Sequence, residues 1–226
     1  MSKPDAARTA LIVHAHPEPQ SFSTAQMLTA AGALRDAGYT VDVLDLYAEN
    51  WPPALDRDDF TSTDGYFKPQ AEQQRAAEEG TLAPRVQEHL DRLLTADLLV
   101  FSFPMWWFSI PAILKGWVDQ VFVMGAVFGG DYGLFDKAAL AGKQAMLLLT
   151  TGGPREAFQS GGTLGPLNDF LFHIHRGMFE FVGYQVLDPV VTYGPARMTD
   201  EQRTEALEAV RESVALVAGD SQLTVH

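Results

Sequence analysis

The chain contains no cysteine among its 226 residues. That absence excludes disulfide bonds, thiolate nucleophiles, and zinc or iron–sulfur sites that need cysteine ligands. Any redox chemistry must therefore come from a bound cofactor. Basic residues are scarce as well, because 16 Lys and Arg stand against 29 Asp and Glu, for a formal net charge of -13. Nucleic-acid binding needs clustered cations, so this balance argues against a nucleic-acid partner.

The sequence also lacks a long uninterrupted apolar run. The longest stretch, Leu98–Leu114, is broken by Ser102, Ser109 and two prolines, so we expect a protein that is not integral to a membrane. The first ten residues are polar and have no apolar segment of the secretory type. We therefore expect a cytoplasmic protein. Its length predicts a single domain over residues 1–226, with a long, weakly periodic insertion at about 47–82.

Short β-prone runs alternate with helix-like segments along the chain. This alternation predicts a parallel sheet covered by helices on both faces. With right-handed crossovers, five strands give a doubly wound, flavodoxin-like α/β fold with strand order 2-1-3-4-5. The expected strands are Thr9–His14, Val41–Leu46, Leu98–Phe103, Ala145–Thr150 and Tyr184–Val191, and the expected helices are Ser23–Ala37, Pro84–Thr95, Ala112–Met124, Pro166–Val182 and Thr199–Ala218.

An aromatic segment follows the third strand. Pro104 ends that strand and Pro111 suits the start of a helix, so the residues between them form an elbow at the carboxyl end of a strand. Doubly wound sheets bind ligands at this edge. Taken alone, the segment favours a packed hydrophobic loop, because aromatic side chains mostly serve packing. The alternative is a platform for a planar ligand, presented by Met105, Trp106, Trp107 and Phe108.

Two further segments follow the first and fourth strands. After the first, Ser21 or Ser23 can cap the next helix and leave its first N–H groups free for a pyrophosphate, to which His16 can add a donor. An ordinary capped helix explains this loop equally well. Metal binding by His14 and His16 lacks a third ligand at a recognised spacing, so we expect no metal site. After the fourth strand, Thr150-Thr151-Gly152-Gly153 offers hydroxyls and close backbone approach to a planar ring.

Together these residues resemble the NAD(P)H:quinone oxidoreductases of the flavodoxin-like fold. The likeness runs from Ala10 to about Val214. It rests on His16 with Ser21-Phe22-Ser23 and Ala25, on Asp45-Leu46-Tyr47, on Phe103-Pro104 with Trp107-Phe108 and the run from Pro111 to Trp117, on Thr150-Thr151-Gly152-Gly153, and on the run from Gly183 to Pro189 with Thr192-Tyr193.

The resemblance implies a flavin, FAD in preference to FMN, with NAD(P)H as electron donor and a quinone or similar aromatic acceptor using one pocket in turn. It also implies a homodimer, whose interface we expect to bury Trp117, Phe122 and the loop near Tyr66 and Phe67. Trp107, Gly152 and Gly153 would carry the catalysis. The residues implied around the flavin are His16, Ser21, Phe22, Ser23 and Ala25 at the pyrophosphate, Pro104, Met105, Trp106, Trp107 and Phe108 along the ring, Thr150, Thr151, Gly152, Gly153 and Phe158 at its other edge, and Arg203 at the adenine end.

One departure from the family pattern concerns proton transfer. The family carries a Tyr and a His at the positions that are Phe158 and Leu164 here, so a proton relay through them does not carry over. Backbone N–H groups of Gly152 and Gly153 are left to stabilise a reduced flavin. The alternative functions are a nitro- or azo-aromatic reductase with the same site, and a flavin-binding regulatory subunit of an ion transporter. No basic cluster in the sequence selects NADPH over NADH.

Overall fold

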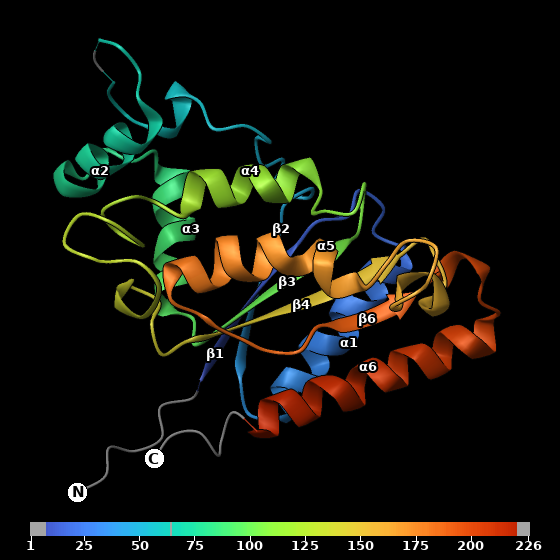
Figure 1. The fold of residues 1–226 in the computed structure, drawn as a ribbon. Coiled ribbons are helices and arrows are strands. Elements are labelled where there is room, and N and C mark those ends of the chain that lie inside the picture. Colours follow the sequence, from blue (N-terminus) through green and yellow to red (C-terminus); the bar gives the residue numbers. More distant parts are fainter. Residues whose placement is uncertain (1–7, 64, 221–226) are drawn as a thin grey trace, which may run out of the picture.

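The computed structural model describes residues 8–63 and 65–220. A parallel sheet lies between two layers of helices (Figure 1). The order β2-β1-β3-β4, with both β5 and β6 beside β4, confirms the doubly wound topology expected from the sequence. The strands are β1 (Thr9–His14), β2 (Thr40–Asp45), β3 (Leu98–Pro104), β4 (Gln144–Thr151), β5 (Gln185–Val186) and β6 (Val190–Tyr193).

The helices cover both faces of the sheet (Figure 1). One layer consists of α1 (Phe22–Asp36) and α6 (Asp200–Asp220), and the other of α3 (Pro84–Thr95), α4 (Ala112–Val121) and α5 (Leu167–Ile174). Within the residues that the structure describes, no helix is long and apolar enough to cross a membrane.

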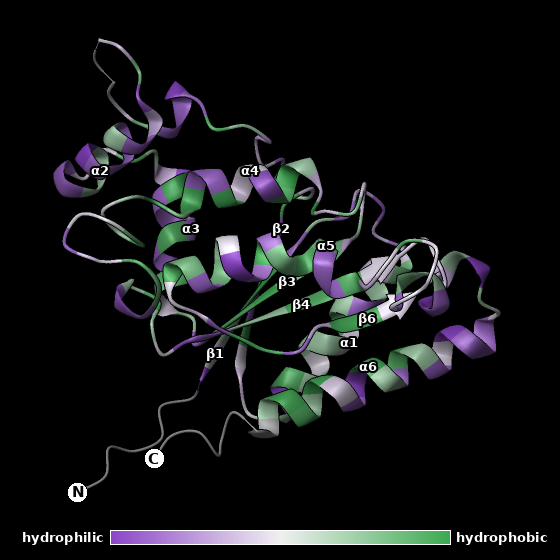
Figure 2. Ribbon diagram, in the orientation of Figure 1, coloured by the Kyte–Doolittle hydropathy of each residue, from purple (hydrophilic) through white to green (hydrophobic). Residues whose placement is uncertain are grey.

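Alternate strand residues supply the two halves of the core. Leu11 and Val13 of β1 join the cluster beneath the α3–α5 layer, whereas Ala10 and Ile12 join the cluster beneath α1 and α6. Since both faces of such a sheet are buried, its central strands are apolar almost throughout. Figure 2 shows this as hydrophobic colouring along β3 and β4.

The fifth strand differs from the single run expected over Tyr184–Val191. It consists of β5 and β6, separated by Leu187-Asp188-Pro189. Its pairing with β4 shifts from Gln144↔Gln185 to Leu148↔Val190, so one extra residue is accommodated between the two pieces. Pro189 has no N–H to offer a ladder, which explains the break.

Two helical segments also differ from expectation. The insertion at about 47–82 contains a regular helix, α2 (Pro69–Glu79), which begins with proline at its first position and ends at Gly80 with φ 69°. The expected Pro166–Val182 helix is regular only as far as the end of α5. It continues as a π-helix, His175–Phe179, and a 3-10 turn, Glu180–Val182.

The α4 helix is shorter than expected and its aromatic side chains lie inside the chain. It ends at Val121 instead of Met124, because Phe122 leaves the helical region at φ -79°, ψ 71°. Trp117 is completely buried, with its ring 5.8 Å from that of Phe101 and 5.9 Å from that of Phe122. The expectation that a subunit interface buries Trp117 and Phe122 is therefore wrong, since the chain's own core buries them.

Candidate functional site

The elbow after β3 is a tight turn formed by aromatic residues. Trp106 and Ser109 exchange two backbone hydrogen bonds, of 3.1 and 3.0 Å. The two residues between them, Trp107 and Phe108, have φ values of 50° and 60°. A turn with two left-handed central residues normally uses Asn or Gly, and each bulky residue in that region costs roughly 1–3 kcal/mol. Strain of this kind is typical of functional sites.

The turn stands at the mouth of a hollow of about 230 Å³, which we call the ring hollow. The elbow and the Gly152-Gly153 turn after β4 both contribute to its lining. Trp107 is 95% exposed, so its indole is available to a ligand. Among the described residues, the lining contains no acidic, basic or histidine side chain: it consists of Met105, Trp107, Phe108, Thr151, Gly152, Gly153, Phe158 and Leu164.

Gly153 faces Phe158 and Leu164, the two residues at which the sequence predicts the family's proton relay to be lost. A Cβ atom at Gly153 would lie 3.0 Å from Phe158 Cε2 and 3.7 Å from Leu164 Cδ1, so a larger residue would push into the hollow. Phe158 is buried, and its ring lies 6.3 Å from that of Phe170. The two apolar side chains make the far end of the ring hollow a surface without a proton donor.

A second hollow of about 490 Å³ lies at the N-terminus of α1, and we call it the phosphate hollow. Ser21 caps α1 by accepting a hydrogen bond of 3.1 Å from the N–H of Thr24. The N–H groups of Phe22 and Ser23 have no partner among the described residues, as is normal for a first helical turn. Such a turn binds anions through its free donors and the helix dipole. The lining is His16, Gln20, Ser21, Phe22, Ser23, Ala25, Pro104, Thr150, Pro195, Ala196, Arg203 and Leu207.

The two hollows adjoin at the carboxyl ends of β3 and β4. Pro104 and Thr150 line the phosphate hollow, and the residues that follow them, Met105 and Thr151, line the ring hollow. The Ser23 hydroxyl lies 2.9 Å from that of Thr150, which ties the start of α1 to β4. The Met105 N–H donates to the Thr150 carbonyl at 2.8 Å. A single long ligand with an anionic middle and a planar end therefore fits across this edge.

A buried polar chain supports the first turn of α1 from below. The His14 ring lies between the Ser102 hydroxyl at 3.0 Å and the Thr24 hydroxyl at 3.1 Å. Burial lowers the pKa of His14, so its ring is neutral at pH 7. His16 Nδ1 lies 3.0 Å from the Glu18 backbone nitrogen and 3.1 Å from the Glu18 carbonyl oxygen. His14 is thus structural, whereas His16 lines the phosphate hollow.

All the site residues predicted from the sequence, except one, line one of the two hollows. Trp106 lines neither hollow; it is 42% exposed and its ring lies 6.4 Å from that of His16. Sequence reasoning missed the wall that β6 and α6 provide. The signal was present, because Pro195 and Ala196 follow the fifth strand and so stand at the same sheet edge as the other loops. The lining residues that were not expected are Gln20, Pro195, Ala196 and Leu207, and Arg197 contacts the Gly-Gly turn from outside.

Comparison with known proteins agrees with this geometry. Residues 8–214 match the model of a family described as having the flavodoxin-like fold. The rat ribosyldihydronicotinamide dehydrogenase [quinone] is 38% identical over 201 residues, which cover 88% of this chain and 87% of the rat protein. The rat NAD(P)H dehydrogenase [quinone] 1 is 36% identical over 222 residues, covering 96% of this chain and 80% of that protein. The chain belongs to the flavodoxin-like quinone oxidoreductase family.

Solved structures place this quinone oxidoreductase in the same group. A Klebsiella pneumoniae protein described as a quinone reductase superposes with a TM-score of 0.87 at 34% identity, covering 93% of this chain and 85% of that one. The NAD(P)H:quinone oxidoreductase of Methanothermobacter marburgensis shares the fold, with a TM-score of 0.73, 24% identity, and coverage of 94% of this chain and 100% of that one. The sequence resemblance to the family is thereby confirmed.

Proposed function

We propose that this oxidoreductase takes a hydride from NAD(P)H and passes two electrons to a quinone through a bound flavin. The observation that carries the proposal is the pairing of the two hollows. Free backbone donors at the α1 N-terminus suit a phosphate, and the adjoining slot between Trp107 and Gly153 suits a planar ring. When bound, the flavin would supply the acceptance and release of hydride.

The residues present fit FAD better than FMN. The phosphate hollow extends past the start of α1 to Pro195, Ala196 and Arg203, so it has walls beyond the place of a terminal phosphate. Leu207 closes the same side. An adenine needs this kind of half-apolar wall, whereas FMN ends at its phosphate. Relatives whose structures hold FMN are 19% and 20% identical to this chain and share the fold.

The protein's own groups bind, orient and exclude water. Phe22 and Ser23 would donate their N–H groups to the pyrophosphate, and the strained elbow would press Trp107 and Phe108 along one face of the ring. Gly153 leaves room at the other edge. A charge-free apolar lining excludes water and favours aromatic acceptors that stack, such as quinones.

A homodimer is part of the proposal. Three apolar side chains that line the ring hollow are exposed, Trp107 by 95%, Phe108 by 39% and Leu164 by 38%, and exposed apolar patches mark interaction sites. A second copy of the chain would cover this patch and close the pocket. Light scattering at micromolar concentration is expected to give twice the chain mass, and a monomer would contradict this. The cytoplasmic location stays a prediction that cell fractionation tests.

Identification of the flavin tests the proposal directly. The purified protein is expected to be yellow, and mass analysis of the heat-released cofactor is expected to show FAD. FMN alone would correct the choice of flavin. A protein that binds neither flavin on reconstitution would remove the proposal.

Steady-state kinetics then test the reaction. Donor and acceptor would use one pocket in turn, so double-reciprocal plots should be parallel, with NADH, NADPH and N-ribosyl-dihydronicotinamide as donors and a benzoquinone or an azo dye as acceptor. Intersecting lines would indicate separate donor and acceptor sites. Gly153→Val should abolish turnover by filling the ring hollow. The matched control Gly177→Ala should not, because a Cβ at Gly177 meets nothing within 4 Å.

A further inference from the structure

The Gly152-Gly153 turn carries a guanidinium on its outer side. Arg197 donates from one terminal nitrogen to the Gly152 carbonyl at 2.6 Å. Arg197 closes the 3-10 turn Pro195–Arg197 that follows β6, so the contact joins the ends of β4 and β6. Gly194 makes room for it, because a Cβ at Gly194, where φ is +62°, would lie 3.1 Å from the same Arg197 nitrogen. The position of this charge is therefore built into the local backbone.

The contact acts on the peptide group between two residues that line the ring hollow. The Gly152 carbonyl and the Gly153 N–H belong to one peptide unit, and both glycines line the hollow. Neither glycine N–H has a hydrogen-bond partner within the described part of the chain. A cation on the carbonyl oxygen polarises the peptide and makes its N–H a stronger donor, since hydrogen bonds in a chain reinforce one another. Charge-assisted bonds are roughly twice as strong as neutral ones.

The charge of Arg197 is also uncompensated. In the described ranges no carboxylate pairs with it, whereas Arg203 on the next helix lies 3.6 Å from Asp200. Among the residues that the structure describes, the ring hollow has no charged side chain, and the apolar side chains of Phe158 and Leu164 line it. In a protein of net charge -13, this makes Arg197 the cation attached most directly to the proposed flavin edge.

We propose that Arg197 is a positioning residue that, through the Gly152-Gly153 peptide, stabilises the negative charge that the flavin ring takes up on reduction. A hydride brings two electrons and one proton, so the ring gains one negative charge while the nicotinamide is left oxidised and positively charged. The Gly153 N–H, strengthened by Arg197, faces that new charge. No protein proton donor is needed. The inference rests on the proposed function, because it concerns the same flavin site.

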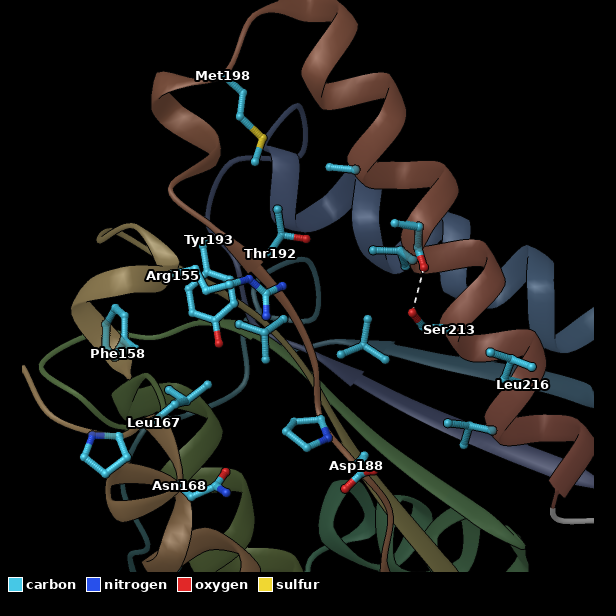
Figure 3. A pocket seen from close by; sticks show the side chains of 18 residues that line it. Arg155, Phe158, Leu167, Asn168, Asp188, Thr192, Tyr193, Met198, Ser213 and Leu216 are labelled. Atoms are coloured by element: carbon cyan, nitrogen blue, oxygen red, sulfur yellow. Dashed lines mark hydrogen bonds between the residues drawn. The ribbon is translucent and has the colours of Figure 1, made fainter. Parts of the chain in front are cut away.

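The test is the two-electron reduction potential of the flavin in three variants of the reconstituted full-length protein. Arg197→Gln removes the charge. The equilibrium constant for two-electron reduction of the flavin should then fall about tenfold, which corresponds to a reduction potential about 30 mV lower. Arg197→Lys keeps a charge and should restore part of the potential. Arg155→Gln is the matched control: Arg155 follows the turn by two residues, and its guanidinium lies over the Tyr193 ring, 4.7 Å from the centroid (Figure 3). It makes no bond to Gly152 or Gly153, and its removal should change the equilibrium constant less than twofold.

A second readout uses sulfite, which adds to oxidised flavins and leaves the ring negatively charged. The affinity of the bound flavin for sulfite is measured by bleaching of the visible flavin absorbance. Relative to the wild type it should fall about tenfold in Arg197→Gln and change less than about twofold in Arg155→Gln. Equal potentials and sulfite affinities for the wild type and Arg197→Gln, with flavin bound, would refute the role of Arg197 and leave the proposed function standing. Equal shifts in Arg197→Gln and Arg155→Gln would also refute it, because they would show that any nearby positive charge has this effect, with or without a bond to Gly152. A wild-type protein that binds no flavin would refute both proposals.

Discussion

Single residues at the elbow decide how a ring can be held. Trp107 projects almost fully from a turn that keeps it at a left-handed φ of 50°. Few intramolecular contacts are gained in return, so the strain is explained better by a ligand than by packing. Phe158, which lines the same hollow, is buried against Phe170 and Tyr193, with ring centroids 6.3 and 6.0 Å away. Trp107 and Phe158, which line the same hollow, therefore have different roles.

This contrast predicts unequal effects of mutation. Trp107→Ala should slow flavin reduction by NAD(P)H by roughly 10²-fold, because it removes one wall and lets the ring and nicotinamide shift. Phe158→Leu keeps an apolar side chain where no acid–base group stood, so it should cost far less than the ~10²-fold of a lost acid or base. Stopped-flow measurement with excess flavin compares them. A larger loss in Phe158→Leu would show that the ring does not lie against the elbow.

A buried histidine away from the site should make stability sensitive to acid. Trp117 Nε1 donates to His89 Nδ1 at 3.0 Å, His89 Nε2 lies 3.0 Å from a Glu49 carboxylate oxygen, and the ring stacks on Trp51. Burial, with the nearby Arg92 charge, lowers the pKa of His89 to about 4. Protonation at Nδ1 would also break the bond from Trp117. The neutral ring therefore donates from Nε2 to Glu49 at pH 7.

The sign of the pH effect follows from this. Below pH ~6.5 the unfolded chain binds a proton at His89 before the folded chain does, so the free energy of unfolding falls from there to about pH 4. The contribution of His89 to that fall is at most about 3 kcal/mol. His89→Gln keeps one acceptor and one donor. In this variant the free energy of unfolding, measured by urea titration, should fall less steeply between pH ~6.5 and about pH 4. If the unfolding free energy of the variant falls as steeply with acid as that of the wild type, His89 is already charged in the folded protein.

At the scale of elements, the strands followed from the sequence better than the loops did. Apolar runs such as Leu98–Phe103 need both faces buried, so their composition alone locates them. In contrast, α2 is built from polar residues and depends on Pro69 and Gly80 at its ends, which gives little periodic signal. The break before β6 depends on Pro189 and on register, which composition does not fix. Arg197 could not be predicted from the sequence for the same reason, because its role depends on where β6 places the loop that follows it.

The packing of α4 against the insertion depends on a missing side chain. A Cβ at Gly116 would lie 2.3 Å from the Pro53 carbonyl oxygen, so no residue larger than glycine fits without moving backbone. Gly116→Ala should therefore lose at least about 2 kcal/mol of unfolding free energy. Gly32, inside α1, is the control because a Cβ there meets nothing within 4 Å. Gly32→Ala should gain roughly 0.5–1 kcal/mol in urea titrations. A harmless Gly116→Ala would contradict the contact between α4 and Pro53.

At the scale of the whole molecule, the negative net charge slows the approach of the proposed electron donor, NADPH. A charge of -13 repels a dinucleotide, although Arg197 and Arg203 stand beside the hollows. Salt screens the distant charges first, with a Debye length of about 8 Å at 0.15 M. We therefore expect kcat/KM for NADPH to rise severalfold from about 0.01 M to 0.15 M salt. N-ribosyl-dihydronicotinamide carries no phosphate and is the control, with no such rise. A fall for NADPH would show that the local arginines dominate the approach.

The exposed elbow gives the protein an optical reporter of its own. Of the four tryptophans, Trp51 and Trp117 are 4% and 0% exposed, Trp106 is 42% exposed and Trp107 is 95% exposed. Collisional quenchers such as acrylamide should therefore reach Trp107 first, and emission from the two core indoles should persist. A flavin seated in the ring hollow would accept excitation energy from the indole beside it and shield it from solvent. Loading of the site can then be followed in unlabelled protein as a loss of the red-shifted, quenchable part of the emission.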